Sequence, residues 1–526
     1  MRTGPDVVVV GSGVAGLAAA LGAAGCGADV LVVEGAGALG GTSALSGGVV
    51  WLPASPQLAA AGLDDSPAAA LAYLHAVAGS NLDESLAQAF VDDAGRVATE
   101  IEQKTPLEWE VLTGWPDYAS ELPGGKAGGR SLWPRTLTMP HEVDVLVQRA
   151  PDQPGGRGDD ASPTSDVADN DGVVLRGPVR GRALVGALVM GALEAGVRLR
   201  TGARASALVV QGGSIVGADV EGERIDGCVV LATGGFQHDA GLVADYFPGA
   251  PVVAMGPPGC RGDGLAMAKN AGAALANMDE GWWMPSMRVP GERFEGVAYY
   301  RPLHAERAKP GSIMVDGHGR RFVDEARNYG DVGRAMRTAV GPASAVARSA
   351  DPGHSCWLLF DAGYRRRYPV GPLEPVDADP AWLMKADDLA GLARAIDVPA
   401  TTLTDTVASF NAGAVTGEDP EFGRGSLAYD RWIGDHAADH PTLAPLTEAP
   451  FYALKVHLGC MGTKGGPRTD DRGRVLADTG RVVEGVYAAG NVAASVFGSA
   501  TPAGGATLGP ALVFGFRAGE AAAGDR

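Results

Sequence analysis

The chain has 526 residues, 46 % of them hydrophobic, so it is long enough for two to four domains with buried cores. Its 43 Lys+Arg against 62 Asp+Glu give a formal net charge of −19, which argues against nucleic acid and anionic lipid as partners. The five cysteines are scattered without a CxxC pair, and no histidines cluster at metal-ligand spacing. We therefore expect no metal and a reducing compartment.

Membrane insertion is not expected either. The chain opens "MRTGPDVVVVGSG", without the basic region and cleavage site of a signal peptide. No run reaches the roughly 18 apolar residues that are needed to span a bilayer. These features predict a cytoplasmic location without a membrane span.

The first predicted elements form a β-α-β unit with a β-branched strand over residues 7–10, an Ala/Leu-rich helix and a second strand over residues 30–33. The turn into the helix reads Gly11-x-Gly13-x-x-Gly16. Gly11 allows a tight turn, Gly13 lets the backbone approach a pyrophosphate, and Gly16 permits close helix–strand packing. The helix N-terminus offers free N–H groups to the anion. This unit predicts dinucleotide binding.

The segment after the second strand extends the expected site. Glu34 ends that strand, where a carboxylate can accept a hydrogen bond from an adenosine ribose hydroxyl. The following "GALGGTSALSGG" offers small groups that suit close contact with phosphate and a flavin ring. The expected cofactor contacts of this segment are Gly41, Thr42, Ser43 and Gly48.

Three later segments identify the dinucleotide. "IDGCVVLATGGF" and "EGVYAAGNVAAS" each end a predicted strand, and a second glycine-rich turn, "SATPAGGATLGPALVFG", lies near the end of the chain. Together they resemble the two-dinucleotide-binding flavoproteins, in which FAD lies extended across the sheet and a late helix N-terminus faces the flavin. The resemblance implies FAD as the cofactor. The further contacts that it implies are Ala205, Thr233, Gly234, Gly490, Asn491 and Leu508.

The order of several motifs narrows the resemblance. "GWPDYASELPGGKAGGRSL", "KPGSIMVDGHGRRFVDEARNY", "GTKGGPRTDDRGRVLADTG" and "ATPAGGATLGPALVFG" follow one another as in 3-ketosteroid Δ1-dehydrogenases, over nearly the whole chain. Those enzymes belong to the succinate dehydrogenase/fumarate reductase flavoprotein superfamily. The histidine that holds a covalent flavin in some members is not matched in "GGTSALSGG", so we expect non-covalent FAD.

This resemblance also implies the domain organisation. We expect an α/β fold with a two-dinucleotide-binding, Rossmann-type FAD domain, made of residues 1–278 and 449–526, and an inserted α+β catalytic domain over residues 279–448. The insert contains aromatic runs such as "WWMPSM", which suit an apolar pocket. Residues 150–173 are dense in Pro, Gly, Ser and Asp, and we predict a mobile surface loop there.

Desaturation beside a ketone needs a group that polarises the carbonyl, a base for the α-proton and flavin N5 as the hydride acceptor. In the resembling enzymes tyrosines dominate this chemistry. The motif "DEARNY" implies Tyr329 as the base, "PDY" implies Tyr118 as its hydrogen-bonding support, and "GGATLG" implies the Gly505 N–H as a donor to the carbonyl. We therefore expect dehydrogenation of a cyclic ketone, a steroid or similar polycycle, with an external electron acceptor.

The late turn departs from the steroid enzymes at one position. Where they have Tyr-Pro, this chain has Thr501-Pro502, so the phenol that joins Gly505 at the carbonyl is missing. Loss of one oxyanion donor typically lowers the rate by a factor of about 10²–10³. The substrate then sits deeper, another donor replaces the phenol, or the substrate is not a 3-ketosteroid. The candidate donors are Tyr299, Tyr300 and Ser499.

Two other functions stay open. The first is an ene-reductase acting on an enone or unsaturated acid, as in fumarate reductases, which would need a carboxylate clamp. Arg320 and Arg321 could form one, but a solvated turn explains them as readily, and His304 and His457 could be acid/base groups, although single histidines are more often surface or satisfied core residues. The second is a non-catalytic flavin-binding redox protein, for which loss of the two tyrosines would be expected.

Overall fold

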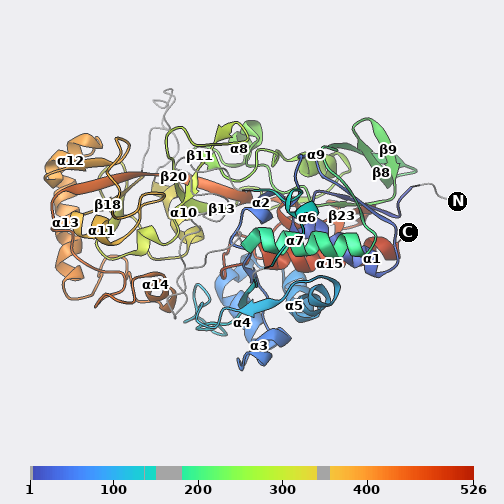
Figure 1. Cartoon of the computed structure of the whole chain (residues 1–526), viewed down its shortest axis with the longest axis horizontal. Helices are drawn as coiled ribbons and strands as arrows, with labels where there is room; N and C mark the ends of the chain where they lie inside the picture. Colours follow the sequence, from blue (N-terminus) through green and yellow to red (C-terminus); the bar gives the residue numbers. More distant parts are fainter. Residues whose placement is uncertain (1–3, 136, 150–179, 340–355, 526) are drawn as a thin grey trace.

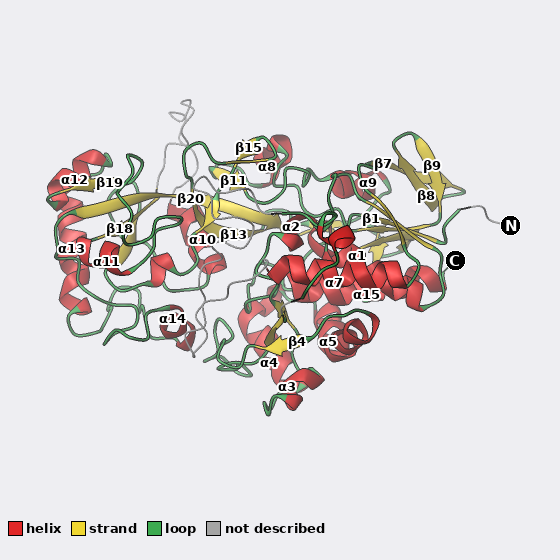
Figure 2. Cartoon of the chain, viewed as in Figure 1, coloured by secondary structure: helices red, strands yellow, loops and turns green. Residues whose placement is uncertain are grey.

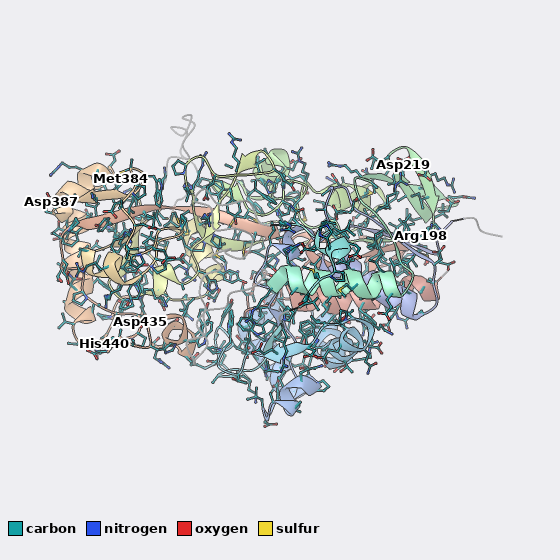
Figure 3. All side chains as sticks on the ribbon, viewed as in Figure 1. Arg198, Asp219, Met384, Asp387, Asp435 and His440 are labelled. Carbon is teal, nitrogen blue, oxygen red and sulfur yellow. The ribbon has the colours of Figure 1, made fainter. Side chains whose placement is uncertain are left out.

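The computed structural model describes residues 4–135, 137–149, 180–339 and 356–525. The molecule is elongated, and its two larger β-sheets follow one another along the long axis (Figure 1). Met384 and Asp387 mark one end of this axis, and Arg198 and Asp219 mark the other (Figure 3). The loop predicted over residues 150–173 lies outside the described part. None of the described helices is long and apolar enough to cross a membrane.

The first sheet has six strands in the order β22-β23-β10-β1-β2-β6, and all neighbours except β22 and β23 run parallel. Strand β1 lies inside the sheet, and all four of its valines are buried, as expected for a parallel sheet covered on both faces. The C-terminal end of β1 therefore places the glycine-rich turn at the carboxyl edge of the sheet. The strands are β1 (Val7–Val10), β2 (Val30–Val33), β6 (Arg198–Arg200), β10 (Cys228–Leu231), β22 (Arg474–Leu476) and β23 (Val482–Ala488).

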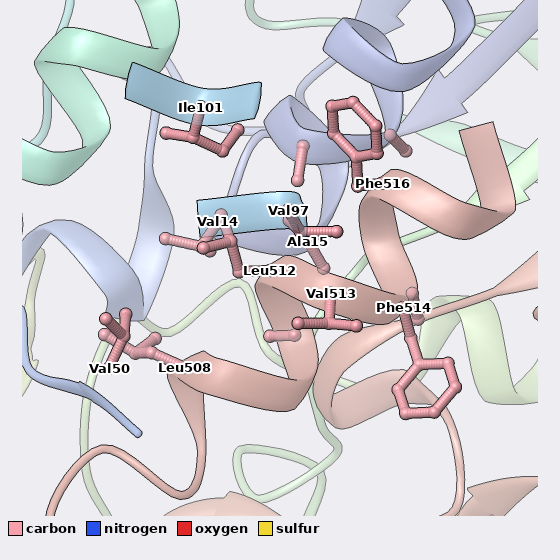
Figure 4. Packing of buried hydrophobic residues seen from close by; sticks show 14 of the residues in the cluster. Val14, Ala15, Val50, Val97, Ile101, Leu508, Leu512, Val513, Phe514 and Phe516 are labelled. Atoms are coloured by element: carbon pink, nitrogen blue, oxygen red, sulfur yellow. The ribbon is translucent and has the colours of Figure 1, made fainter. Parts of the chain in front are cut away.

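Helices cover one face of this sheet. The helix of the predicted β-α-β unit and the last helix of the chain pack together (Figure 4), and glycines lie at their contact. A Cβ atom on Gly22 would lie 2.3 Å from the Phe516 carbonyl oxygen, and one on Gly519 would lie 1.9 Å from that of Ala19. Only glycine therefore allows this spacing. The helices of this layer are α1 (Val14–Gly25), α5 (Glu84–Lys104), α7 (Arg180–Glu194) and α15 (Leu508–Gly524).

A three-stranded antiparallel sheet covers the opposite face. Val7 and Val9 pack in the cluster that contains α1, whereas Val8 and Val10 pack with the middle strand of this small sheet. Successive residues of a strand point to opposite faces, which explains the alternation. The strands are β7 (Ala205–Gln211), β8 (Ser214–Val220) and β9 (Glu223–Asp226).

The second large sheet is built around one long strand, β20 (Phe451–Thr463), which runs through the middle of that part of the molecule (Figure 2). Strand β20 pairs with four strands, all of which precede it in the sequence. It begins inside the range predicted for the FAD domain, and so does β11, although both pair within this sheet. The other strands are β11 (Val252–Ala254), β13 (Gly281–Met287), β16 (Arg301–Pro302), β17 (Ser312–Val315), β18 (Cys356–Phe360) and β19 (Met384–Ala386).

Shorter elements complete the fold. Helices α3 (Pro56–Ala60) and α4 (Pro67–Ala78) lie below the first large sheet in Figure 1, and other helices surround the second. The small sheets are formed by β3 (Val50–Trp51), β4 (Trp109–Val111) and β5 (Ser131–Pro134), by β12 (Leu275–Ala276) and β21 (Gly466–Pro467), and by β14 (Arg293–Phe294) and β15 (Val297–Ala298). The helices are α2 (Gly41–Ala44), α3 (Pro56–Ala60), α4 (Pro67–Ala78), α6 (His141–Asp144), α8 (Ala240–Tyr246), α9 (Asp263–Asn270), α10 (Tyr329–Ala339), α11 (Ala362–Arg367), α12 (Leu389–Ala395), α13 (Ala400–Ala414) and α14 (Ala428–Ile433).

Candidate active site

The glycine-rich turn connects β1 to α1 at the carboxyl edge of the first sheet. Gly11 has φ +107°, and a Cβ atom there would lie 2.4 Å from the Ala232 carbonyl oxygen. A Cβ atom on Gly16 would lie 1.9 Å from the Gly11 carbonyl oxygen. These two positions need glycine for the fold itself.

Gly13 differs from the other two glycines. It precedes α1 in extended backbone with φ −65°, and a Cβ atom there would meet only Ser43 Oγ at 3.4 Å and the Gly40 carbonyl oxygen at 3.9 Å. These are ordinary contacts, so packing within the protein does not require glycine at this position. The space is open beside the free N–H groups of a helix N-terminus, as an approaching pyrophosphate requires.

Polar groups around the turn hold it in place. Glu34 Oε2 accepts hydrogen bonds from the Ser12 N–H at 3.0 Å and from the Ser12 hydroxyl at 2.6 Å. The Ser43 hydroxyl accepts one from the Val14 N–H at 3.2 Å. Gly41, Thr42 and Ser43 form the short helix α2, so they lie directly against the turn. Glu34 keeps further lone pairs for a ribose hydroxyl.

The remaining cofactor candidates from the first part of the chain lie around this edge. The Thr42 hydroxyl oxygen lies 3.8 Å from Cys260 Sγ, and a Cβ atom on Gly234 would lie 3.1 Å from the same sulfur. Thr233 accepts a hydrogen bond from the Gly264 N–H at the start of α9. Gly48 has φ +69° and packs against the backbone at the start of α7.

Other candidates mark the two ends of the expected cofactor. Ala205 begins β7, two residues after Ala203, whose N–H donates to the Glu34 carbonyl oxygen at 2.8 Å. At the far end, Gly490 packs on α1 and Asn491 Oδ1 accepts a hydrogen bond from the Trp282 indole N–H at 3.1 Å. Both line a pocket at the start of α15, the helix that begins with Leu508.

These observations fit FAD. An open glycine position and an acidic strand end meet at the N-terminus of α1, and the start of α15 borders the pocket that Gly490 and Asn491 line. Within the described residues, no three acidic, histidine or cysteine side chains gather as a metal site would require. The expectation that the flavin is non-covalent stays a prediction.

The late turn lies directly against the loop that contains Tyr118. The Pro502 carbonyl oxygen accepts hydrogen bonds from the Tyr118 N–H at 3.0 Å and from the Tyr73 hydroxyl at 2.5 Å. Gly505 has φ +90°, and a Cβ atom there would lie 2.6 Å from the Trp51 nitrogen, so glycine is required. No acceptor for the Gly505 N–H is found among the described residues, which leaves this donor available to a ligand.

Tyr118 and Tyr329 meet although 211 positions separate them in the chain. Their rings are edge to face, with centroids 5.8 Å apart and planes at 82°. Tyr329 begins α10, and Tyr118 and Tyr329 are 1 % and 7 % exposed. The next residue, Gly330, touches the late turn, since a Cβ atom there would lie 2.5 Å from Thr501 Oγ1. The structure thus brings together the four residues predicted to act in catalysis.

Burial dominates the electrostatics of this pair. It raises the pKa of Tyr329 to about 12, and the nearby Tyr118 hydroxyl opposes that rise. Burial also raises the pKa of Tyr118 well above its usual value, and the neighbouring phenols raise it further. The neighbouring phenols are those of Tyr329 and Tyr429. The Tyr118 hydroxyl makes no hydrogen bond of good geometry with any described residue. Hydrogen bonds of this kind are often long before a substrate is bound.

Comparison with known proteins identifies the family. A family model described as FAD binding domain matches residues 6–508. The chain belongs to this family. It is 37 % identical to a 4-oxocyclohexanecarboxylate 2-dehydrogenase of Sinomonas cyclohexanicum, over 100 % of this chain and 94 % of that protein. It is 36 % identical to a 3-oxosteroid 1-dehydrogenase of Mycobacterium tuberculosis, over 98 % of this chain and 97 % of that protein.

The fold agrees with that family. The structure of a 3-ketosteroid Δ1-dehydrogenase from Sterolibacterium denitrificans, in complex with 1,4-androstadiene-3,17-dione, matches with a TM-score of 0.88 and 33 % identity, over 99 % of this chain and 100 % of that one. A flavocytochrome c3 fumarate reductase shares the fold at a TM-score of 0.65 and 24 % identity. The predicted resemblance, the FAD cofactor and the FAD-dependent oxidoreductase class are confirmed.

Some residues of this FAD-binding protein differ from the sequence interpretation. Arg321, for which a solvated turn was an equal explanation, is buried, and its guanidinium binds the carboxylates of Glu325 and Asp419. It is therefore committed to a structural ion-pair network. His304, expected to be a surface or satisfied core residue, lies with its ring centroid 5.9 Å from that of Tyr329, and its Nδ1 has no hydrogen-bond partner among the described residues.

Sequence reasoning missed three buried residues beside the site: Arg307, Tyr429 and Lys464. Among the proposed substitutes for the missing phenol, Tyr300 packs against the tyrosine cluster, whereas the Ser499 hydroxyl accepts a hydrogen bond from Asn81. The Lys464 ammonium reaches the carbonyl oxygens of residues 499 and 500 at 2.7 Å. Arg307 and Tyr429 lie outside the motifs used above, whereas Lys464 lies within "GTKGGPRTDDRGRVLADTG", from which no role was predicted for it.

Proposed function

We propose that the protein removes two hydrogens from neighbouring carbons beside the carbonyl of a cyclic ketone, forming a carbon–carbon double bond. The observation that carries the proposal is the packing of two buried tyrosines, edge to face, against the glycine turn that ends the FAD cradle. A flavin-binding protein without catalysis would have no need for two buried phenols and an unpaired Gly505 N–H at one place.

Each residue has one role in this reaction. The Tyr329 oxygen, deprotonated, takes the proton from the carbon next to the carbonyl. Tyr118 donates a hydrogen bond to that oxygen and so favours its deprotonated form. The Gly505 N–H, aided by the Thr501 hydroxyl, stabilises the negative charge that develops on the carbonyl oxygen. Bound FAD supplies the acceptor for the hydride and passes the electrons to an external electron acceptor.

The cofactor contacts and the architecture belong to the same proposal. The residues Gly11, Gly13, Gly16 and Glu34 hold the adenosine and pyrophosphate side, and Asn491 and Leu508 hold the flavin side. We assign residues 1–278 and 449–526 to a discontinuous FAD domain and residues 279–448 to an inserted catalytic domain. The first large sheet supports this division, while β11 and β20 join the insert across its boundaries.

The substrate class is a cyclic ketone, either a 3-ketosteroid or a smaller cyclohexanone carboxylate. Relatives whose names give these two substrate classes are about equally similar to the chain. The ene-reductase alternative loses support because Arg321, the buried member of the predicted clamp, is bound to two carboxylates of the protein itself.

Anaerobic mixing tests the proposal. The holoprotein is mixed with 4-oxocyclohexanecarboxylate, with 4-androstene-3,17-dione and with fumarate as separate probes, and flavin absorbance is followed. We expect at least one ketone to bleach the flavin and to yield its desaturated product. A protein whose flavin is bleached by neither ketone, and which once chemically reduced is reoxidised by fumarate, would contradict the proposal.

A further inference from the structure

Tyr429 extends the tyrosine pair by a third buried ring. It lies in α14 and is fully buried. Its ring centroid lies 4.5 Å from that of Tyr118, with the planes at 64°. Because Tyr118 also meets Tyr329, the three rings form a row with Tyr118 in the middle. We call these three residues the tyrosine row.

A buried cation interacts electrostatically with Tyr429 at the end of this row. Arg307 is fully buried, and its guanidinium donates to the carbonyl oxygens of Leu303 at 3.2 Å and Arg327 at 2.6 Å. Its Nη2 has no hydrogen-bond partner within the described residues, and the same holds for the Tyr429 hydroxyl. Burial raises the pKa of Tyr429, and the charge of Arg307 opposes that rise. Two unsatisfied groups of complementary character, buried near each other, require an explanation.

We infer that Tyr429 and Arg307 are positioning residues that hold the Tyr118 hydroxyl as a donor toward the Tyr329 oxygen. The inference rests on the proposed function, in which Tyr329 is the base. Each phenol has a single proton to donate, so a cation at one end makes all the hydrogen bonds of the row point the same way. Arg307 donates toward Tyr429, Tyr429 toward Tyr118, and Tyr118 toward Tyr329.

The consequence is a lower pKa for the Tyr329 hydroxyl, the proposed base. Burial alone disfavours a negative charge on Tyr329, whereas aligned donors that end in a guanidinium favour it. Hydrogen bonds in a series also polarise one another, so Tyr429 acts on Tyr329 through Tyr118 without touching it. The row thereby offsets part of the cost of placing the base in an apolar pocket.

The other groups that face the row are neutral or carboxylic. The His304 ring packs 5.9 Å from the Tyr329 ring, and burial, together with the charges of Arg307 and Lys309, lowers the pKa of His304 to about 3. It therefore stays uncharged near neutral pH. The carboxyl groups that face Arg307 or Tyr429 have pKa values that are raised by burial: Glu306, Asp324 and Asp430.

Tyr429→Phe tests the inference, with Tyr487→Phe as the matched control. Tyr487 is also buried, but it lies in β23 of the first large sheet and in a different hydrophobic cluster from the row, and its hydroxyl donates to Asp525. We measure kcat/KM against pH with whichever of the two ketones above bleaches the flavin. In Tyr429→Phe the acid limb should move up by about one pH unit, and kcat/KM should fall about 10-fold at neutral pH. KM and flavin content should stay unchanged, and Tyr487→Phe should keep the parent profile.

A second readout does not depend on turnover. Tyrosinate absorbance in the near ultraviolet is titrated in the holoprotein, and the titration of Tyr329 is isolated by subtracting the Tyr329→Phe protein, in both the parent and the Tyr429→Phe background. The pKa of Tyr329 should be higher in the Tyr429→Phe background. Equal values in the two backgrounds would overturn the inference.

The outcomes separate the two proposals. If Tyr329→Phe is inactive while Tyr429→Phe keeps the parent pH profile, the inference falls and the proposed function stands. A Tyr429→Phe protein that loses activity equally at every pH would reveal a packing role and would also overturn it. If Tyr329→Phe is fully active, the proposed base is wrong, and the absorbance titration alone decides whether the row exists.

Discussion

Lys464 Nζ lies 3.3 Å from Thr501 Oγ1, at the position where the resembling steroid enzymes have a tyrosine. Both side chains are buried, and the ammonium also lies over the Trp282 ring, 4.2 Å from its centroid. When Lys464 is protonated its ammonium can only donate, so the Thr501 oxygen accepts this hydrogen bond and the hydroxyl proton points elsewhere. The Thr501 hydroxyl is thus left as a donor beside Gly505, and it reaches less far than the phenol of a tyrosine would.

Thr501→Tyr should separate the two substrate classes. A phenol beside the Gly505 N–H would restore a carbonyl donor for a 3-ketosteroid, and we expect kcat on 4-androstene-3,17-dione to rise up to about 10-fold. The same ring would fill the space that Thr501 leaves open, so KM for 4-oxocyclohexanecarboxylate should rise. Steady-state kinetics on both ketones measures these changes.

The matched control is Thr501→Val, which removes the hydroxyl but keeps the shape of the side chain. It should lower kcat on either active ketone, because it supplies no donor in place of the lost one. If Thr501→Tyr changes both ketones in the same direction, or Thr501→Val matches the parent, the late turn does not contact the substrate carbonyl through residue 501.

Lys464 should make stability depend on pH. Burial, with repulsion from Arg334, lowers the pKa of Lys464 from 10.5 to about 7. Between these values the unfolded chain holds a proton that the folded protein has released, so the free energy of unfolding rises with pH across this window. Lys464→Met should remove that rise, and Lys269→Met, at an exposed lysine of α9, should keep it. Thermal midpoints of the holoproteins from about pH 7 to about pH 10 measure the difference. Parallel curves for the parent and Lys464→Met would refute the assignment.

Gly13→Val tests the cofactor cradle. The fold leaves room for a Cβ atom at Gly13, with Ser43 Oγ 3.4 Å away, so the variant should fold. The added methyl groups would occupy the space that a pyrophosphate needs, and bound flavin should be lost. Visible absorbance of the purified protein measures flavin, and Gly524→Val, at an open position at the end of α15, serves as the control. Stoichiometric flavin in Gly13→Val would mean that the turn does not contact the pyrophosphate.

Local motifs predicted the FAD cradle and the tyrosine pair because short stretches of sequence contain the residues that form them. Gly11 and Gly16 are required by backbone contacts that any such turn makes, and "PDY" and "DEARNY" each carry one phenol. The ion-pair partner of a buried charge can lie far away in the sequence, where no local motif reveals it. The sequence around Arg321 suggests a turn residue, because its partner Asp419 lies 98 positions away and only the fold brings the two together.

The same limit applies to Tyr429 and to β20. Tyr429 sits in "LAYDRW", which no motif singles out, and its role follows only from packing against Tyr118. The segment "FYALKVHLGCMGT" is rich in β-branched and aromatic residues, as a strand would be, but its composition does not say which sheet it joins. Pairing with β13 and β18 depends on contacts between distant parts of the chain.

The most direct test of the account is the rate at which a ketone bleaches the bound flavin without oxygen, in the parent and in Tyr329→Phe. The substitution removes one oxygen and keeps the ring that packs against Tyr118. We predict full flavin content, an unchanged thermal midpoint and bleaching slowed by about 10² or more, the scale of general-base catalysis. A Tyr329→Phe protein that bleaches within a few-fold of the parent rate would contradict the assignment of Tyr329 as the base.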